Sequence, residues 1–326
     1  MKHLKLFLLM GLLFFLVGVP TLQASEVSRL TIALDDWVGY GLFYLAKEKG
    51  FMRDEGVDLV FVDEPLDSAR RDAFQQGILD CEGGTLDLLA SKIAQNSPIV
   101  SVMETDQSFG SDGIVANENI KTLEDLKGKT VALARDDAGE TFISVVFHKK
   151  DLSFNDLVIV STAPENVAET FVKNEAEACV TWEPQISQAL QKPGAHILTS
   201  SREYPGIIID TLNVRKDLVE KDPLLVKKLM RGWFTAVKYY QEHPVEASGI
   251  VAKYYKMSSE EYRKQVAGLK WISYEEQKSI LEYKKLIDTF KVITDIKFEN
   301  GRISQKFDGT KFINHTLLEK LYENRR

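Results

Sequence analysis

Two segments of about 50 residues carry the same features in the same order, and this repeat limits the possible folds more than any other property of the chain. The first opens on the apolar residues 31–34 and closes at Cys81, and the second opens on residues 130–133 and closes at Cys179. Within each, a helical pattern, an apolar strand and an amphipathic helix follow one another. Two copies are too few to stack as a solenoid. The repeat therefore predicts two similar α/β lobes, and a cleft between lobes is a common place for a small ligand.

The first 24 residues have the pattern of a secretory signal peptide. Lys2 and Lys5 form a basic start, residues 6–19 form an apolar run that is short for a membrane span, and Ala24 is a small residue before the cut. An uncleaved membrane anchor is the alternative. Because no cysteine lies near the cut, we expect no lipid anchor. We predict a periplasmic protein that is cleaved near Ala24.

Composition and cysteine content narrow the class of protein. The mature chain of about 300 residues is long enough for two domains. Its formal net charge of −7 becomes −9 without Lys2 and Lys5, and no basic patch typical of nucleic-acid binding is present. Two cysteines in an oxidising compartment invite a disulfide. Cys81 and Cys179 hold equivalent positions in different lobes, however, so we predict two separate buried thiols.

The order of strands and helices predicts how the chain is divided. Alternating strands and helices are typical of a mostly parallel sheet flanked by helices, here one in each lobe. Residues 105–112 are polar and fit a first crossing between the lobes, and residues 213–215 fit the return. We therefore expect lobe 1 to comprise residues 25–111 and 215–326, and lobe 2 to comprise residues 112–214.

From Asp222 onward the pattern is helical. Asp222 precedes a proline at the first helical position, which is a typical helix start. Ser258 with Glu261, and Ser273 with Glu276, have the spacing of a capping box. We expect several helices over this part of the chain, the last of them running from residue 317 to the end.

Candidate binding residues follow from the topology alone. In an open α/β sheet, ligands bind beyond the carboxyl ends of the strands. This rule selects the residues after the first and third strands of each copy, where aromatic and charged side chains gather. Asp106 and Asp112 lie near the predicted crossing. The candidates for ligand binding are Asp36, Trp37, Tyr40, Thr85, Arg135, Asp136, Asp137, Trp182 and Glu183.

These candidates also have purely structural explanations. Asp36 could cap a helix N-terminus, and Asp136 and Asp137 could be solvated acids that favour one. Arg135 could pair with its own neighbours, and Trp182 could be ordinary packing. Both copies nevertheless place aromatic and charged side chains at the same topological position, which favours a binding role.

Motifs of the common enzyme classes are absent from the sequence. It contains no Gly-x-Ser-x-Gly, no phosphate-binding loop, no Gly-x-Gly-x-x-Gly and no His-Glu-x-x-His. Its five histidines show no metal-ligand spacing. We therefore expect a binding protein that has no catalytic activity and needs neither a cofactor nor a metal.

Five stretches of the chain together form a recognisable ordered set: residues 37–40 (WVGY), 45–50 (LAKEKG), 111–115 (SDGIV), 126–132 (LKGKTVA) and 181–184 (TWEP). This set resembles the solute-binding proteins of ABC importers, in the group that binds nitrate, taurine, aliphatic sulfonates and thiamine-pyrimidine precursors. The similarity extends from about Leu30 to beyond Trp271. It implies a type II periplasmic-binding-protein fold, with two lobes that close on a small molecule and a monomer that docks on an inner-membrane permease.

The resemblance also implies where the ligand lies. Carried over by position, Trp37, Tyr40, Thr85 and the pair 182–183 would line the cleft. The loop of residues 135–140 would face it at a helix N-terminus.

The ligand class is predicted from a difference between that loop and the corresponding loop of the anion binders in this group. Anion binders of this group tend to use small and hydroxyl residues there, leaving the helix N-terminus free for the anion. Here Asp136, Asp137 and Glu140 would repel an anion, whereas carboxylates and aromatic faces both stabilise cations. We therefore favour an amine or a flat nitrogen heterocycle such as a pyrimidine. Arg135 leaves a small anion (sulfonate, taurine or nitrate) as the alternative.

Two other functions remain as alternatives. The chain could present its ligand to a sensor receptor instead of a permease. It could also be an enzyme, since the fungal thiamine-pyrimidine synthases share this fold, but the signal segment and the lack of a convincing cleft histidine oppose this.

Overall fold

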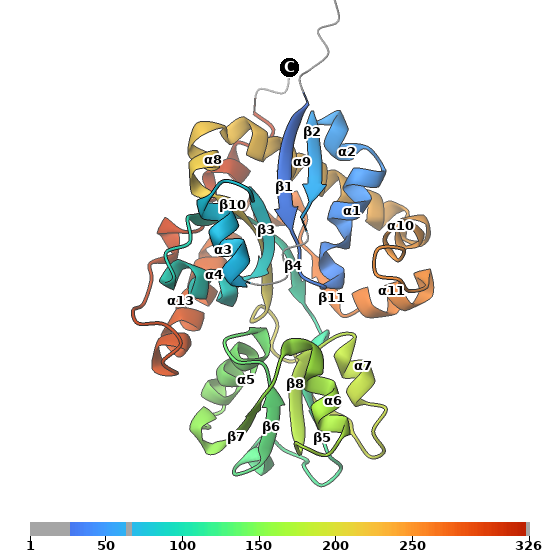
Figure 1. Cartoon of the computed structure of the whole chain (residues 1–326), viewed down its shortest axis with the longest axis vertical. Helices are drawn as coiled ribbons and strands as arrows, with labels where there is room; N and C mark the ends of the chain where they lie inside the picture. The colour runs from blue at the N-terminus through green and yellow to red at the C-terminus, as the bar shows by residue number, and fades with distance from the viewer. Residues whose placement is uncertain (1–26, 63–66, 324–326) are drawn as a thin grey trace, which may run out of the picture.

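The computed structural model describes residues 27–62 and 67–323, which form two lobes, each built on one sheet. Figure 1 shows a larger upper lobe (lobe 1) and a smaller lower lobe (lobe 2), with the chain crossing between them near the centre. The six-stranded sheet of lobe 1 has the order β11-β4-β10-β3-β1-β2, and the five-stranded sheet of lobe 2 has the order β7-β6-β8-β5-β9. The predicted two-lobed α/β fold is confirmed. The predicted signal peptide lies outside the described residues.

The bounds of the elements are as follows. The strands are β1 (Ser28–Ala33), β2 (Val57–Phe61), β3 (Cys81–Thr85), β4 (Ile99–Ser108), β5 (Asp112–Ala116), β6 (Thr130–Leu133), β7 (Val158–Ser161), β8 (Ala178–Trp182), β9 (His196–Ser200), β10 (Ile209–Arg215) and β11 (Leu269–Trp271). The α-helices are α1 (Gly41–Glu48), α2 (Phe51–Asp54), α3 (Asp67–Gln75), α4 (Leu86–Ala94), α5 (Ala138–Lys149), α6 (Val167–Val172), α7 (Gln185–Ala189), α8 (Lys216–Lys221), α9 (Pro223–Glu242), α10 (Pro244–Val251), α11 (Ser259–Val266), α12 (Tyr274–Gln277), α13 (Ile280–Glu299) and α14 (Thr316–Glu319). The short 3-10 helices are η1 (Val38–Tyr40), η2 (Glu124–Leu126), η3 (Phe154–Asp156), η4 (Pro164–Asn166) and η5 (Gly309–Lys311).

The predicted repeat is visible in the strand pairing of both lobes. In lobe 1, β1 pairs in parallel with β2 and β3, and Ile32 lies opposite Cys81. In lobe 2, β6 pairs in parallel with β7 and β8, and Ala132 lies opposite Cys179. The two cysteines therefore occupy equivalent strands, as predicted, and both are buried free thiols. Burial raises the pKa of Cys179 to about 12.

The two copies also share a hydrogen-bond pattern at the start of the repeat. The backbone N–H of Thr31 donates to the carboxylate of Asp80 at 3.0 Å, and the N–H of Asp80 donates back to the threonine hydroxyl at 3.0 Å. Thr130 and Glu177 make the same exchange at 3.3 and 3.1 Å. An acidic residue before the third strand thus fixes the start of the first strand in each lobe.

The sheets are mixed, which corrects the prediction that each is mostly parallel. The repeat supplies the parallel strands, but β10 pairs antiparallel with β3 and β4, and β5 pairs antiparallel with β8 and β9. Each of these strands lies beside the third strand of a copy. The lobe boundaries stay a prediction, but the expected return at residues 213–215 is too late, because β10 already belongs to the six-stranded sheet.

The two crossing segments are joined to each other. The hydroxyl groups of Ser108 and Ser201 lie 2.7 Å apart, and the backbone N–H of Gly110 donates to the Ser201 hydroxyl at 2.7 Å. Ser201 is fully buried. Both connections between the lobes therefore meet at this serine.

Local signals predicted the helix starts of the C-terminal part well. The carboxylate of Asp222 accepts a hydrogen bond from the N–H of Leu225 at 3.0 Å, and both expected capping boxes, at Ser258 and Ser273, are present. The expected last helix is short, α14, and residues 324–326 are not described. The strand β11 was not predicted, because three residues are too few to show a period of two.

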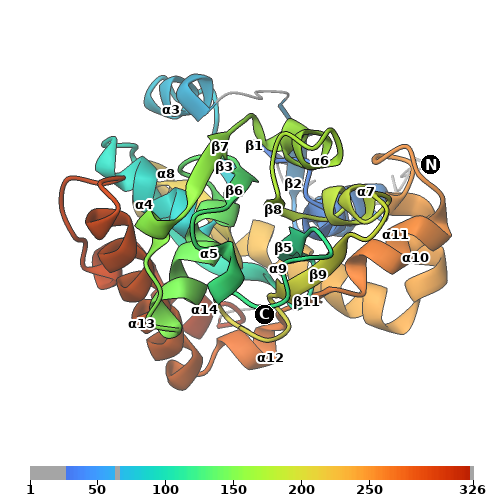
Figure 2. The same cartoon turned by 90° about the horizontal axis from the view of Figure 1, so that it is seen from below.

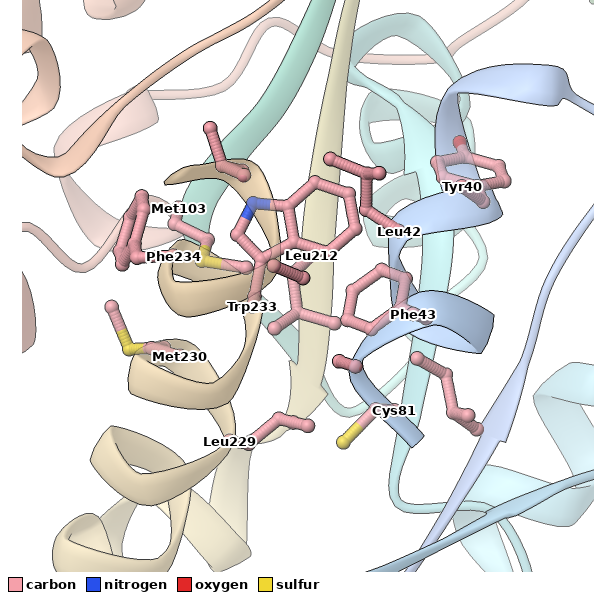
Figure 3. Packing of buried hydrophobic residues seen from close by; sticks show 14 of the residues in the cluster. Tyr40, Leu42, Phe43, Cys81, Met103, Leu212, Leu229, Met230, Trp233 and Phe234 are labelled. Carbon is pink, nitrogen blue, oxygen red and sulfur yellow. The ribbon is translucent and has the colours of Figure 1, made fainter. Parts of the chain in front are cut away.

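The core of lobe 1 is built around large aromatic side chains. Trp233 of α9 and Phe43 of α1 have ring centroids 4.3 Å apart, and both are fully buried. Figure 3 shows Leu212 of β10 beside this pair, with Cys81 beneath it and Tyr40 to one side. A fully buried aromatic pair adds about 0.5–1.5 kcal/mol beyond its burial. This packing holds α1, and with it Tyr40, at a fixed place relative to the sheet.

One helix contacts both lobes. Leu286, Phe290 and Ile293 of α13 pack into a hydrophobic cluster of lobe 1, whereas Ile296 near its end packs into the cluster of lobe 2. Figures 1 and 2 both show α13 beside the upper lobe with its end close to α5 of the lower lobe. Among the described helices, none is both long and apolar enough to cross a membrane.

Candidate functional site

The strand-end rule places the candidate residues where the two lobes meet. Trp37 follows β1 and Thr85 ends β3, whereas Trp182 ends β8 of the other lobe. Trp182 is partly buried and packs against the hydrophobic cluster of lobe 1. Asp136, which follows β6, accepts a hydrogen bond from the Ser91 hydroxyl of lobe 1 at 2.9 Å. The candidates of both copies therefore contribute to the junction between the lobes.

Three aromatic side chains from the C-terminal half hold the segment of residues 37–39. The Tyr255 hydroxyl donates to the carbonyl of Trp37 at 2.7 Å, the Tyr262 hydroxyl to that of Val38 at 3.0 Å, and the Trp271 indole N–H to that of Gly39 at 2.7 Å. These bonds pair three successive carbonyl groups. The segment is therefore positioned by residues more than two hundred positions further along the chain, which the sequence could not indicate.

Trp37 and Tyr40 direct their polar groups at buried carboxyl groups. The indole N–H of Trp37 donates to Asp106 Oδ1 at 2.9 Å, and the hydroxyl of Tyr40 donates to Asp210 Oδ1 at 2.5 Å. Gly39 makes this approach possible, because a Cβ atom there would lie 2.3 Å from the indole nitrogen and 2.6 Å from Asp106 Oδ2. Burial and the Asp210 carboxyl group together raise the pKa of Tyr40 well above its ordinary value.

Asp106, Asp112 and Asp210, which we term the junction carboxyls, lie close to one another at the ends of β4, β5 and β10. They are 0%, 4% and 3% exposed. Burial raises the pKa of Asp106 to about 7 and that of Asp112 to about 7. Burial, reinforced by the charge of Asp106, raises the pKa of Asp210 well above its usual range. At neutral pH the carboxyl groups of Asp106 and Asp112 are therefore partly protonated, unlike ordinary carboxylates.

The acidic residues of the loop 135–140 were expected to carry uncompensated negative charge, but the structure pairs them with other groups. Asp136 has a left-handed backbone with a φ of 57°, and its carboxylate lies 2.7 Å from Nζ of Lys297. Lys297 is buried and also pairs with the buried Asp87 at 3.5 Å. Asp137 is the N-cap of α5, and its carboxylate accepts a bond from the N–H of Ala138. Both carboxylates are therefore engaged within the protein, Asp136 in an ion pair and Asp137 at the N-terminus of α5.

Glu140 is the centre of a second group of charges. Its carboxylate accepts two bonds from Arg302, at 2.6 and 2.8 Å, one from Arg135 at 2.7 Å and one from the N–H of Asp136 at 2.8 Å. Burial acts to raise the pKa of Glu140, but these hydrogen bonds outweigh it, so the pKa lies below its usual value. Arg135 is therefore engaged within its own loop.

The remaining candidates, Asp36, Glu183 and Thr85, make fewer side-chain hydrogen bonds and ion pairs. Asp36 is exposed. Glu183 Oε2 accepts a bond from the N–H of Ser187 in α7. Thr85 occupies the N-cap position of α4 without a side-chain capping bond, and its buried hydroxyl oxygen has no hydrogen-bond partner.

Some residues of the junction were not among the candidates. Asp210 follows three isoleucines and lies at the start of β10, and a carboxylate directly after an apolar run was a usable signal for it. Lys297 and Arg302 come from the other end of the chain, and no local pattern identifies them. Within the described ranges, no group of three or more potential ligands could hold a metal ion. A separate groove of about 470 Å³ lies on lobe 2, lined by Glu169, Val172, Asn174, Gln188, Gln191, Lys192 and Pro193.

Comparison with known proteins identifies the family. The family model described as "NMT1/THI5 like" matches residues 38–247. The chain belongs to this NMT1/THI5-like family. That assignment confirms the resemblance found in the sequence, and it agrees with relatives named as aliphatic sulfonates-binding and taurine-binding proteins.

The relatives cover between about half and nearly all of the chain. A putative aliphatic sulfonates-binding protein of Bacillus subtilis is 25% identical over 98% of this chain and 96% of its own length. The taurine-binding periplasmic protein of Escherichia coli is 24% identical over 48% of this chain and 49% of its own. The structure of the periplasmic aliphatic sulphonate binding protein of Escherichia coli matches with a TM-score of 0.74 at 18% identity, covering 89% of this chain and 99% of that one. This structural match establishes that the chain has the periplasmic-binding-protein fold.

Proposed function

We propose that this chain is the substrate-binding component of an ABC importer and works in the periplasm. The observation that carries the proposal is the meeting of the strand-end residues of both copies at the junction of two lobes. In a protein of this design, the ligand contacts both lobes only when they close, so binding shifts the hinge equilibrium. The partners would be a small molecule and an inner-membrane permease, and the binding protein itself would act as a monomer without catalysis.

For the ligand, we propose a small organic anion of the sulfonate type. The relatives named for aliphatic sulfonates and for taurine support this alternative over the amine or nitrogen heterocycle that the sequence favoured. The main objection to an anion was the acidic loop. Asp136 and Glu140 are paired with Lys297, Arg302 and Arg135, so their charges are largely compensated and the objection loses most of its force.

A thermal-shift screen of the mature protein from Ser25, refolded once to remove carried-over ligand, tests the proposal. The panel sets taurine, alkyl sulfonates and nitrate against amines and pyrimidines. A ligand at a hundred times its dissociation constant stabilises the folded state by about 2.7 kcal/mol, which gives a clear shift. Stabilisation by the sulfonates supports the proposal. Stabilisation by pyrimidines or simple amines alone would restore the first prediction, and no response to any compound would contradict a transport role for these ligands.

A further inference from the structure

Two of the junction carboxyls, Asp106 and Asp210, lie in a row with Thr85 on one face of the lobe 1 sheet. Asp210 of β10 lies directly opposite Thr85 of β3 on one side and opposite Asp106 of β4 on the other. Residues directly opposite each other on neighbouring strands present their side chains on the same face. Asp112, four residues after the end of β4, begins β5 and lies opposite Trp182 of lobe 2. The row therefore runs from lobe 1 to the first strand of lobe 2.

Several oxygen atoms of this row are buried without a hydrogen-bond partner. They are Oδ2 of Asp106, Oδ2 of Asp112 and Oγ1 of Thr85. Most buried polar atoms in folded proteins are hydrogen-bonded, so three orphans at one place call for an explanation. A bound molecule that donates hydrogen bonds there would satisfy all three.

The charges of the row are also uncompensated within the described part of the chain. Neighbouring acids each have a cation: Glu82 pairs with Lys92 at 2.7 Å, and Asp87 and Asp136 share Lys297. In contrast, none of the ion pairs among residues 27–62 and 67–323 involves a junction carboxyl. The side chains that donate hydrogen bonds to them are neutral, among them the indole of Trp37 and the hydroxyl of Tyr40. Burying a carboxylate without a cation costs free energy, so a bound cation at this place would stabilise the folded protein.

We propose that the junction carboxyls, with Thr85 and Trp37, form a subsite for a protonated amine of the ligand. An ammonium group has three N–H donors and a positive charge, which match orphaned acceptor oxygens and the missing counter-charge. The aromatic rings of Trp37 and Tyr40 beside the carboxyls favour a cation further. This inference rests on the proposed function. It narrows the ligand from any small anion to a short molecule that carries both an amine and an anionic group.

Titration calorimetry with two matched probes tests the subsite. Taurine carries an ammonium and a sulfonate, whereas ethanesulfonate has the same length up to the sulfonate and lacks the amine. We expect the wild-type mature protein to bind taurine at least about tenfold more tightly, which corresponds to 1.4 kcal/mol. Asp106→Asn and Asp210→Asn should each bring the ratio of the two affinities to within about twofold of one.

The exposed Asp58 of β2 provides the matched control. Asp58→Asn removes a carboxylate charge from the same sheet and should leave the preference for taurine unchanged. Equal binding of taurine and ethanesulfonate by the wild-type protein would overturn the amine subsite and leave the proposed function standing. Binding of neither probe, with stabilisation by a simple diamine, would overturn the sulfonate and support the subsite. A preference for taurine that survives Asp106→Asn and Asp210→Asn together would place the amine elsewhere and overturn the inference.

Discussion

Lys297 of α13 and Asp136 of lobe 2 form an ion pair of 2.7 Å across the junction between the lobes. The lysine side chain is 3% exposed, and it reaches Asp87 of lobe 1 at 3.5 Å as well. One buried cation therefore connects a carboxylate from each lobe. Arg302, a few residues further on, binds Glu140 of lobe 2 in the same manner. The end of α13 thus holds the lobes together on one side of the junction.

Replacement of this lysine should cost considerable stability. Lys297→Met leaves Asp87, which is 2% exposed, without its cation. Breaking a buried ion pair in this way costs about 3–5 kcal/mol, so we expect a loss of about 3 kcal/mol in the free energy of unfolding, measured by urea denaturation. Lys285→Met on the same helix removes an exposed pair with Glu282 and should cost less than about 1 kcal/mol. Equal stability of the two variants would mean that the ion pairs of Lys297 contribute nothing to the free energy of unfolding.

A methyl group at Gly39 should disturb the Trp37–Asp106 contact. The new Cβ atom would lie 2.3 Å from the indole nitrogen, so the indole or the carboxyl group must move. We expect Gly39→Ala to destabilise the protein by about 1–3 kcal/mol, as overpacking does. Gly249→Ala in α10 meets open space and should stabilise by about 0.5–1 kcal/mol through helix propensity. Thermal unfolding followed by circular dichroism distinguishes the two, and a Gly39→Ala protein as stable as the wild type would contradict the described geometry.

The junction carboxyls should make stability depend on pH in an unusual direction. The pKa of Asp112 is about 7 because of burial, with further contributions from Asp87 and Glu183, and that of Asp106 is about 7 because of burial, with Asp112 adding to it. A carboxyl group with a raised pKa in the folded state stabilises it most when protonated. Its contribution is complete below the unfolded pKa of about 4 and is lost as the pH rises through about 7.

Chemical denaturation of ligand-free protein between pH 5 and 8, roughly the window in which these groups titrate, measures this effect. We expect Asp112→Asn to flatten the fall in stability across that range, because asparagine does not ionise. Glu183→Gln, which leaves Asp112 in place, should flatten it less. An identical pH profile for Asp112→Asn and the wild type would show that the buried carboxyl group does not titrate there.

Trp182 should matter for ligand affinity more than for folding. Its side chain is partly buried and reaches from the end of β8 to the hydrophobic cluster of lobe 1. We expect Trp182→Ala to weaken binding of the sulfonate identified in the screen by about tenfold or more, or about 1.4 kcal/mol, with the folded state retained. Val172→Ala, a truncation at an exposed position of lobe 2, is the control. Unchanged affinity of Trp182→Ala in calorimetry would remove this residue from the site.

The sequence predicted those parts of the fold that depend on local patterns. The repeat gave the equivalent positions of Cys81 and Cys179, and the caps gave the helix starts at Asp222, Ser258 and Ser273. The antiparallel strands β5 and β10 escaped prediction, because their pairing joins segments that are distant in the chain. No periodicity within a strand indicates whether its neighbour runs parallel or antiparallel.

Only those residues of the candidate site that follow the strands of the repeat could be predicted from the sequence. The strand-end rule selected Trp37 and Tyr40, since the topology of a sheet fixes which ends come together, and the structure shows both beside buried carboxyl groups. The charge state of the acidic loop was not predictable, because Asp87 meets its lysine across 210 positions of sequence. Because the sequence does not show that Lys297 and Arg302 pair with Asp136 and Glu140, these two residues were interpreted as free anions. That interpretation led to the preference for a cationic ligand.

A crystal structure of the mature protein grown with millimolar taurine tests the central claim most directly. The account predicts one taurine molecule between the lobes, in contact with Trp37 or Thr85 of lobe 1 and with Trp182 of lobe 2, and with its nitrogen at the junction carboxyls. Taurine bound only in the surface groove of lobe 2, or no taurine bound at all, would contradict it.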